Sequence, residues 1–203
     1  MRSLLESLLR YTGDVRSEDR EDFVTALEVA SRRIDALGRF VSGFADVVRI
    51  PSPHRATMNF TDTLRGLIAL ITPEAEARRI QLEIDINGNE TVNADALQLE
   101  QVVLNVLRNA MDAAGEDGTV RIALHDGTLT IADSGPGIAD SDRPHLFTPF
   151  FTTKREGRGI GLTVVQEVLR NHGFPFALEN GAGGGAEFTV RFPTREHDVA
   201  ATM

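Results

Sequence analysis

Apolar residues recur at helical spacing along the first quarter of the chain. From Glu18 to about Ile50 they follow a strict four-three alternation, which is the pattern of a coiled-coil seam. A shorter leucine-rich stripe precedes the Thr12-Gly13-Asp14 turn, so the two segments together predict a helical hairpin. A hairpin of this kind cannot bury both of its faces alone. We therefore expect it to pair with a second copy, which predicts a homodimer.

Pro51-Ser52-Pro53 ends this pattern, because proline lacks the amide donor and restricts the residue before it. The sequence therefore predicts three parts. A partial dimerisation hairpin with its linker spans 1–53, a second domain spans 54–194, and a tail spans 195–203.

The second domain alternates between helical and strand-like patterns. Helices are expected at 62–79, with Pro73 as an internal flaw, and at 94–114 and 161–172. We expect strands, mainly antiparallel, at 80–86, 120–125, 128–132, 176–179 and 187–192. The middle helix should bury Leu97, Val102, Val103, Val106, Leu107 and Ala110. Helices alternating with strands predict an α/β fold with two packed layers.

Composition narrows the possible partners. The net charge of −9 and the pI near 5.0 disfavour nucleic acid, whose phosphates require clustered positive charge. The chain has no cysteine, which excludes disulfides, thiolate metal sites and cysteine nucleophiles. No apolar run approaches the length of a membrane span, so we expect no direct membrane contact in this segment. A cytoplasmic location is expected, either alone or as the cytosolic C-terminal part of a membrane-bound sensor.

Asparagines at helical spacing are the first chemical signal. Asn105 and Asn109 share one face of the middle helix, and Asp112 follows about a turn later. Asparagine is a mediocre helix former, so two on one face call for a polar partner. That partner is either solvent or a hard cation such as Mg²⁺, which an amide oxygen can coordinate together with phosphates and water.

A glycine-rich turn directly follows a predicted strand at Asp133-Ser-Gly135-Pro-Gly137. As a bare string it is more often an ordinary turn than a site. In a functional interpretation, the Asp133 carboxylate accepts a hydrogen bond from the exocyclic amine of adenine, and the glycines allow the backbone to approach the base.

The segment from Leu146 to Lys154 is aromatic and apolar within a stretch that is otherwise rich in Gly, Pro and Ser. Its phenylalanines, Phe147 among them, are expected to anchor a long loop. Lys154 is the sole lysine of the chain, and with Arg155 and Arg158 it supplies positive charge for phosphates.

A second glycine series, Gly157-Arg-Gly159-Ile160-Gly161-Leu162, opens the last predicted helix. Glycines at a helix start leave amides free to meet anionic oxygens. The same series could also serve as a plain hinge. It differs from a dinucleotide fingerprint, because no parallel strand-helix-strand unit surrounds it.

The order and spacing of these signals resemble the characteristic boxes of histidine kinases, within the wider ATPase superfamily of gyrase, Hsp90, histidine kinases and MutL. The resemblance runs from about Phe60 to Pro193. The residues that carry it are Asn105-x-x-x-Asn109, Asp133-x-Gly135-x-Gly137, Phe147-x-Pro149-Phe150, Gly157-x-Gly159-x-Gly161-Leu162 and Gly183-x-Gly185-Ala186-x-Phe188.

The resemblance implies a Bergerat-type two-layer α/β sandwich that binds ATP and Mg²⁺. In it Asp133 reads adenine, Asn109 holds the metal, Asn105 and Lys154 are the catalytic candidates, and the loop 134–160 closes as a lid. It also implies transfer of the γ-phosphoryl group to a histidine and then to an aspartate of a response regulator receiver domain. The implied nucleotide-binding residues are Asn105, Asn109, Asp112, Asp133, Gly135, Gly137, Phe147, Lys154, Arg158, Gly159, Ile160, Gly161 and Leu162.

Two departures qualify the resemblance. Ala186 stands where the family often has threonine, so a water-mediated contact to adenine is either missing or supplied by another residue. No histidine lies in a helical His-acidic sequence, so we expect the phosphoacceptor to be absent from this chain, which then would not autophosphorylate alone. The five histidines are expected at the surface: His54, His125, His145, His172 and His197.

Three other functions stay open. A related ATPase of the superfamily would need a general base four residues before Asn109, where this chain has Asn105, an amide that is a poor base. A serine kinase of the superfamily shares the nucleotide boxes but fits the long heptad helix and proline linker less well. A pseudokinase or dimeric scaffold would bind nucleotide without chemistry.

Overall fold

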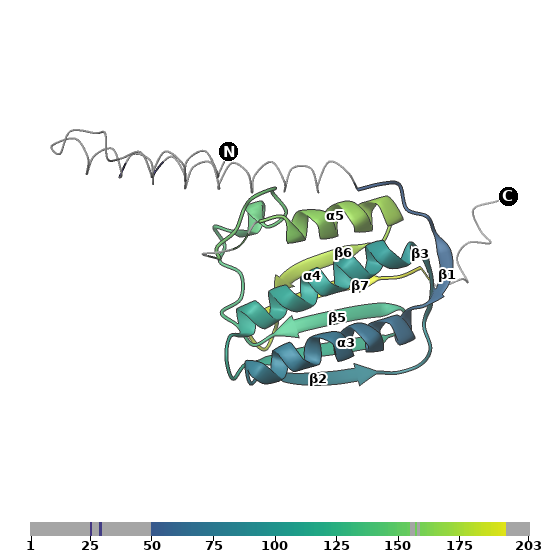
Figure 1. Ribbon diagram of the computed structural model, residues 1–203, viewed down its shortest axis with the longest axis horizontal. Helices are drawn as coiled ribbons and strands as arrows, with labels where there is room; N and C mark the ends of the chain where they lie inside the picture. The colour runs from purple at the N-terminus through teal and green to yellow at the C-terminus, as the bar shows by residue number, and fades with distance from the viewer. Residues whose placement is uncertain (1–24, 26–28, 30–49, 155–156, 158, 194–203) are drawn as a thin grey trace, which may run out of the picture. The chain divides into compact units, whose positions relative to one another are not determined.

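The computed structural model describes residues 50–154, 157 and 159–193, together with the helical residues Thr25 and Val29 (Figure 1). The chain divides into two compact units, Met1–Arg49 and Ile50–Met203, and nearly all described residues belong to the second. The predicted coiled-coil seam and its homodimer contacts therefore lie outside the described residues, as do Arg158 and the tail.

A five-stranded sheet forms one layer of the second unit. In spatial order its strands are β2 (Gln81–Ile86), β4 (Thr119–His125), β5 (Thr128–Asp133), β7 (Ala186–Arg191) and β6 (Phe176–Asn180). The first pair, β2 and β4, is parallel, and the other neighbours are antiparallel. A parallel pair needs a long crossover, and here the chain between β2 and β4 contains a helix.

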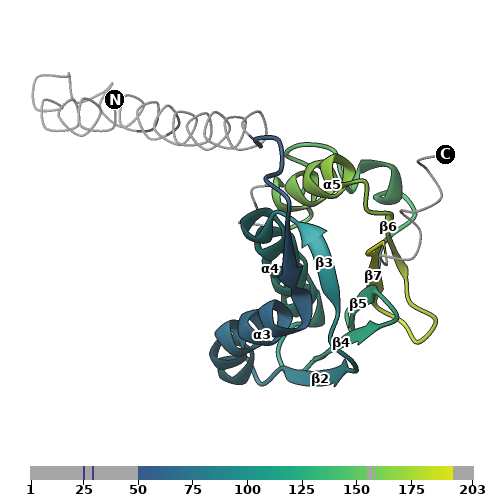
Figure 2. The ribbon, with the colours of Figure 1, turned by 90° about the vertical axis from the view of Figure 1, so that its right-hand side faces the viewer.

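Three helices form the second layer and lie together on one face of the sheet (Figures 1 and 2). They are α3 (Phe60–Ala77), α4 (Ala96–Ala114) and α5 (Gly161–His172). This arrangement confirms the predicted two-layer α/β sandwich. Among the described helices, none is long and apolar enough to cross a membrane.

The core lies between the two layers. Helical stripes and alternate strand residues supply its largest fully buried side chains, which are Phe60, Phe188, Leu64, Ile71, Leu99, Leu107, Met111, Ile122, Leu124, Leu129, Ile131 and Leu169. Burying a side chain of this size stabilises the fold by about 1.5–3 kcal/mol relative to leaving it exposed.

Two short strands were not predicted. β1 (Ala56–Asn59) and β3 (Thr91–Ala94) form a separate antiparallel pair. Each strand leads directly into a capped helix. Asn59, the last residue of β1, caps α3, and its Oδ1 accepts from the Asp62 amide at 3.1 Å. Asp95, the residue after β3, caps α4, and its carboxylate accepts from the Gln98 amide at 3.2 Å. Four residues are too few to produce a clear alternation in the sequence.

Three expectations about side chains meet different outcomes. Leu97, expected to be buried, is 77% exposed because it lies in the first turn of α4, off the stripe that faces the core. His172, expected at the surface, is buried at the end of α5, with 3% of its surface exposed. Pro73 lies inside α3 and does not end the helix, which continues to Ala77.

Candidate functional site

Asp133 is the last residue of the central strand β5. Side chains alternate across a strand, and the buried positions of β5 are Leu129, Ile131 and Asp133, so the carboxylate falls in the phase that faces the helices. Its Oδ1 accepts hydrogen bonds from the amides of Gly135 at 2.8 Å and Ala186 at 3.2 Å. Within the described part of the chain, nothing donates to Oδ2, which leaves one oriented acceptor in a largely buried place.

Glycines surround this carboxylate because no side chain would fit. A Cβ on Gly185, whose φ is +71°, would collide with the Asp133 carbonyl oxygen. A Cβ on Gly135 would collide with the Ala113 carbonyl at the end of α4 and lie 2.8 Å from Asp133 Oδ1. The backbone therefore packs directly around Asp133, which holds its Oδ1 on two amides.

Asn180 of β6 fixes the beginning of the loop that follows β5. Its Oδ1 accepts from the Ile138 amide at 2.6 Å, and its Nδ2 donates to the Ile138 carbonyl at 3.0 Å. Gly137 has a φ of +76°, and a Cβ there would lie 2.8 Å from Asn180 Oδ1. The predicted glycine thus permits this close approach. Asn180 therefore fixes the direction in which the loop leaves the sheet. The sequence motifs did not single out this residue.

The asparagine pair of α4 faces the start of α5. A Cβ on Gly161 would lie 3.7 Å from Asn105 Oδ1 and 3.9 Å from Asn109 Nδ2. Ile160 at the N-cap of α5 makes no side-chain cap hydrogen bond. The first amides of α5 therefore remain available to an anionic ligand beside two amide side chains, as the glycine series predicted.

Lys154 reaches across to the same face of α4. Its Nζ donates to Asn109 Oδ1 at 2.9 Å and to Asp112 Oδ2 at 2.7 Å. On its other oxygen Asp112 accepts from Arg78, 3.0 Å away. Partial burial of Asp112 acts to raise its pKa, but the hydrogen bonds and charges of Lys154 and Arg78 outweigh this and hold the pKa below its ordinary value. Asp112 is thus an anion between two cations.

The aromatic part of the loop is anchored as predicted. The Phe147 ring packs edge-on against Phe176 of β6, with centroids 5.6 Å apart, and the Phe147 carbonyl accepts from Thr163 of α5 at 3.4 Å. At the far end of the loop, the Gly159 carbonyl accepts from the Phe150 amide at 2.8 Å, and Ile160 is buried. These contacts hold the loop against α5 and the sheet on both sides of Lys154.

A cavity of about 170 Å³ lies under this loop. It contains three of the predicted residues, Gly137, Lys154 and Leu162, whereas Asp133 and Asn109 lie outside its lining. Ligand pockets usually measure about 300–1,000 Å³. The cavity is therefore smaller than a usual ligand pocket. The full lining is Gly137, Ile138, Ala139, Asp142, Leu146, Phe151, Thr152, Thr153, Lys154 and Leu162.

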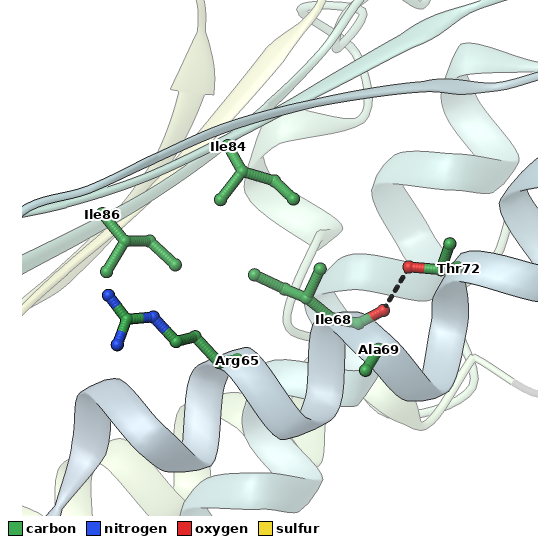
Figure 3. Close-up of a pocket in the computed structure, with 6 residues that line it drawn as sticks. All are labelled: Arg65, Ile68, Ala69, Thr72, Ile84 and Ile86. Atoms are coloured by element: carbon green, nitrogen blue, oxygen red, sulfur yellow. Dashed lines mark hydrogen bonds between the residues drawn. The ribbon is translucent and has the colours of Figure 1, made fainter.

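A larger hollow of about 420 Å³ lies elsewhere, between α3 and the edge strand β2 (Figure 3). Its lining is mostly apolar and contains none of the predicted site residues: Arg65, Ile68, Ala69, Thr72, Ile84 and Ile86. The larger hollow is therefore not the place where the predicted chemical residues lie.

The donors around the loop suit a magnesium nucleotide. Asn105 and Asn109 offer amide oxygens, and an ammonium already occupies Asn109 Oδ1, which shows that this oxygen attracts a cation. Among the described residues, no group of three or more His, Asp or Glu side chains could hold a metal ion by itself. A divalent cation here would depend on ligand phosphates and water, which is how Mg²⁺ is commonly bound.

Comparison with known proteins identifies this constellation. Residues 94–196 match the family described as histidine kinase-, DNA gyrase B- and HSP90-like ATPase. The chain belongs to this ATPase family. The matched range contains both asparagines, Asp133 and all of the glycine series, and the observed sandwich is the Bergerat type that the resemblance implied.

Two curated relatives of this chain are named as sensors. The chain is 34% identical to the sensor histidine kinase ZraS of Salmonella typhimurium over 94% of its own length and 42% of ZraS. It is 32% identical to the C4-dicarboxylate transport sensor protein DctS of Rhodobacter capsulatus over 87% of this chain and 28% of DctS. The chain thus spans less than half the length of these curated relatives.

Solved structures agree with this assignment. The catalytic domain of histidine kinase ThkA aligns with a TM-score of 0.62 and 27% identity, over 69% of this chain and 95% of that domain. Full-length ShkA in complex with AMPPNP aligns with a TM-score of 0.65 and 27% identity, over 95% of this chain and 43% of ShkA.

Proposed function

We propose that this chain is the ATP-binding catalytic part of a two-component sensor histidine kinase. It transfers the γ-phosphoryl group of ATP·Mg²⁺ to a histidine outside the chain, from which the group passes to an aspartate of a response regulator receiver domain. The names of the relatives ZraS and DctS support a sensor kinase, and the AMPPNP bound by ShkA supports an adenine nucleotide.

The observation that carries this proposal is the Asp133 carboxylate, of which only Oδ1 accepts hydrogen bonds from described residues. Its Oδ1 is fixed by two backbone amides, so Oδ2 has a defined direction, and within the described region it has no donor of its own. A carboxylate oxygen is acceptor-only when ionised and suits the exocyclic amine of adenine. The amide of Ala186 contacts Oδ1 through the backbone, which any residue at that position could do.

The remaining roles follow from position. Asn109 would hold Mg²⁺, Asn105 and the first amides of α5 would meet phosphate oxygens, and Lys154 would neutralise charge as the phosphoryl group leaves. The metal supplies charge neutralisation on the phosphates when it is bound. Gly135, Gly137 and Gly159 shape the backbone, Phe147 and Ile160 anchor the loop, and Asp112, Leu162 and Arg158 complete the proposed nucleotide-binding set.

Phosphoryl transfer fits this site better than hydrolysis. A hydrolase needs a side chain that removes a proton from water, and the position four residues before Asn109 is Asn105, whose amide cannot do so. A pseudokinase that binds nucleotide without chemistry is the second candidate, and it has the same binding residues. Only an assay of transfer separates these two functions.

The proposal extends to the rest of the chain. We place the dimerisation hairpin and linker at 1–53, the catalytic domain at 54–194 and a tail at 195–203, and we propose that the hairpin pairs two copies as a homodimer. The location we propose is the cytoplasm, as the cytosolic part of a longer sensor. No role for nucleic acid is proposed, given the net charge of −9.

Replacing Asp133 with asparagine tests the adenine contact. The substituted side chain would keep an oxygen for the two backbone amides but present an NH₂ group where Oδ2 now lies, opposite the donor of adenine. We expect ADP affinity, measured by calorimetric titration, to fall roughly 10- to 100-fold, the effect of losing a hydrogen bond to a charged group. Asp126→Asn in the exposed β4–β5 turn is the matched control and should bind ADP like the wild type. Equal affinities for all three proteins would place the adenine elsewhere.

Transfer is tested by incubating the full chain with [γ-³²P]ATP, with and without a helical peptide that carries a His-Glu pair. A kinase without its own acceptor should label the peptide with acid-labile phosphate and leave itself unlabelled. Nucleotide binding without any labelling would support the pseudokinase. Self-labelling would show that one of the five histidines of the chain is an acceptor.

A further inference from the structure

Two contacts of Lys154 join segments that are far apart in the sequence. Its ammonium lies 2.9 Å from Asn109 Oδ1 and 2.7 Å from Asp112 Oδ2, and these partners precede it by 45 and 42 residues. Both oxygens lie on α4, whereas Lys154 belongs to the loop after β5. The lysine is therefore the point at which the loop is fastened to the helix that carries the asparagine pair.

Arg78 keeps the anionic partner of Lys154 in place. This residue caps α3, and its guanidinium donates to Asp112 Oδ1 at 3.0 Å and to the Met111 carbonyl at 2.9 Å. With one oxygen held by Arg78, Asp112 turns its other oxygen to Lys154. A fixed carboxylate binds an ammonium better than a freely rotating one, because less side-chain freedom is lost on contact.

The amide oxygen of Asn109 would serve the lysine and a divalent metal together only against the repulsion of two positive charges. Mg²⁺ binds its ligands at about 2.0–2.1 Å and prefers near-ideal geometry. An ammonium on the second lone pair of the same oxygen would bring its positive charge close to the metal, and the two charges would repel each other. Lys154 and the proposed metal therefore compete for the Asn109 oxygen.

We propose that Lys154 is an exchangeable latch, which fastens the loop to Asn109 and Asp112 until a metal nucleotide displaces it. The displaced ammonium then turns to the phosphates, whose negative charge replaces that of Asp112. Asp112 and Arg78 act as positioning residues for the latched state. The exchange step rests on the proposed function, whereas the latch itself is a property of the nucleotide-free protein.

The latch is tested first without nucleotide. Because Lys154 is the sole lysine, acetylation with an amine-reactive ester modifies one side chain besides the chain terminus, and mass spectrometry of the full chain after digestion gives its rate. We expect Asp112→Asn and Arg78→Gln to acetylate at Lys154 about two to five times faster than the wild type, the range that a surface ion pair supports. Arg79→Gln is the matched control. This neighbour of Arg78 is paired with Glu116 and Asp117 instead, and its loss should leave the rate unchanged.

The exchange is tested by titrating ADP with and without Mg²⁺. Arg78→Gln weakens the latch but keeps Lys154 and every proposed nucleotide-binding residue, so its Mg²⁺-dependent gain in ADP affinity should exceed that of the wild type by about two- to fivefold. An equal or smaller gain would overturn the exchange. An acetylation rate that is the same in Asp112→Asn and the wild type would overturn the latch, even where nucleotide binds. If ADP does not bind the wild type at all, the proposed function fails, and the acetylation rates still decide the latch.

Discussion

The two ends of the α4–α5 pair hold polar side chains in opposite ways. At one end the amide of Asp95, which caps α4, donates to Nε2 of His172, the last residue of α5. At the other end Gly161, the first residue of α5, lies beside Asn105 and Asn109. The two helices are therefore antiparallel neighbours, with one polar cluster at each end of the pair.

The first cluster, which we call the linker end, uses backbone partners. His172 Nδ1 lies 2.8 Å from the Val168 carbonyl while Nε2 accepts from the Asp95 amide at 3.0 Å, so both nitrogens of the buried ring have a backbone partner. The two Asp95 oxygens accept from the amides of His54 and Gln98. Backbone groups cannot turn away, and these hydrogen bonds are therefore lost only when the fold itself opens.

The second cluster, which we call the nucleotide end, uses side-chain partners. Lys154 and Arg78 each contact Asp112 through flexible, partly exposed side chains, with 39% of the Lys154 side chain and 43% of the Asp112 side chain accessible. Such contacts contribute little to stability but can be exchanged for a ligand. The difference indicates that the linker end maintains the fold and that the nucleotide end can change partners.

The largest effect that this comparison predicts is for His172→Ala. The substitution removes a buried ring and leaves the Asp95 amide without its partner. We expect the free energy of unfolding, measured with urea, to fall by about 3 kcal/mol. His54→Ala is the control, since its exposed ring is lost but its amide still reaches Asp95. A loss below about 1 kcal/mol for His172→Ala would show that the linker end has no special role in stability.

Asp95→Ala should have the next largest effect. It removes the N-cap of α4 and the acceptor of the His54 amide together, and loss of such a cap costs about 1–2 kcal/mol. Asp95→Ser retains a hydroxyl for the Gln98 amide and should recover part of that loss. ADP affinity should be the same in both variants, because the contacts of Asp95 lie at the opposite end of α4 from Asn109. A change in affinity would show that the two ends are coupled.

Periodicity in the sequence was enough to find much of this site. The four-residue spacing of Asn105 and Asn109 and the strand phase that ends at Asp133 are local patterns, and the structure has both. The same reasoning applied to α5 would have found His172, which continues the buried positions Val165, Val168 and Leu169 by a further three residues.

Other features depend on which segments meet in space. Arg78 and Asp112 are 34 residues apart and form an ion pair. The adjacent Arg79 instead binds Glu116 and Asp117. No local sequence pattern indicates which of the two arginines pairs with Asp112. The role of Asn180 likewise depends on β6 lying beside the start of the loop. Contacts of this kind follow from the packing of α3, α4 and the sheet edge, which no local pattern specifies.

Asp112→Asn should change stability less than either substitution at the linker end. It weakens the ion pairs with Lys154 and Arg78, but the amide oxygen of the variant can still accept one hydrogen bond from either cation. Exposed pairs of this kind contribute about 0.2–1 kcal/mol, so we expect urea unfolding to change by less than about 1 kcal/mol. Raising the salt concentration should reduce the difference further. A loss as large as that of Asp95→Ala would mean that the nucleotide end is structural as well.

The smallest effect is the pH dependence of the linker end. Burial acts to raise the pKa of Asp95, but hydrogen bonds from the His54 and Gln98 amides outweigh it and hold the pKa below its ordinary value of about 4. A carboxyl with a depressed pKa in the folded state contributes stability above its unfolded pKa and loses that contribution as the pH falls through the folded value.

Unfolding curves of the wild type and Asp95→Asn between pH 6 and pH 2.5 test this sign. The wild type should be the more stable protein at pH 6, and the difference should shrink once the pH drops below about 4. Asp112 and Asp117 also have lowered pKa values, but both proteins contain them, so their contributions cancel in the difference. A gap that is constant with pH would mean that Asp95 acts at the linker end through its hydrogen bonds alone, without its charge.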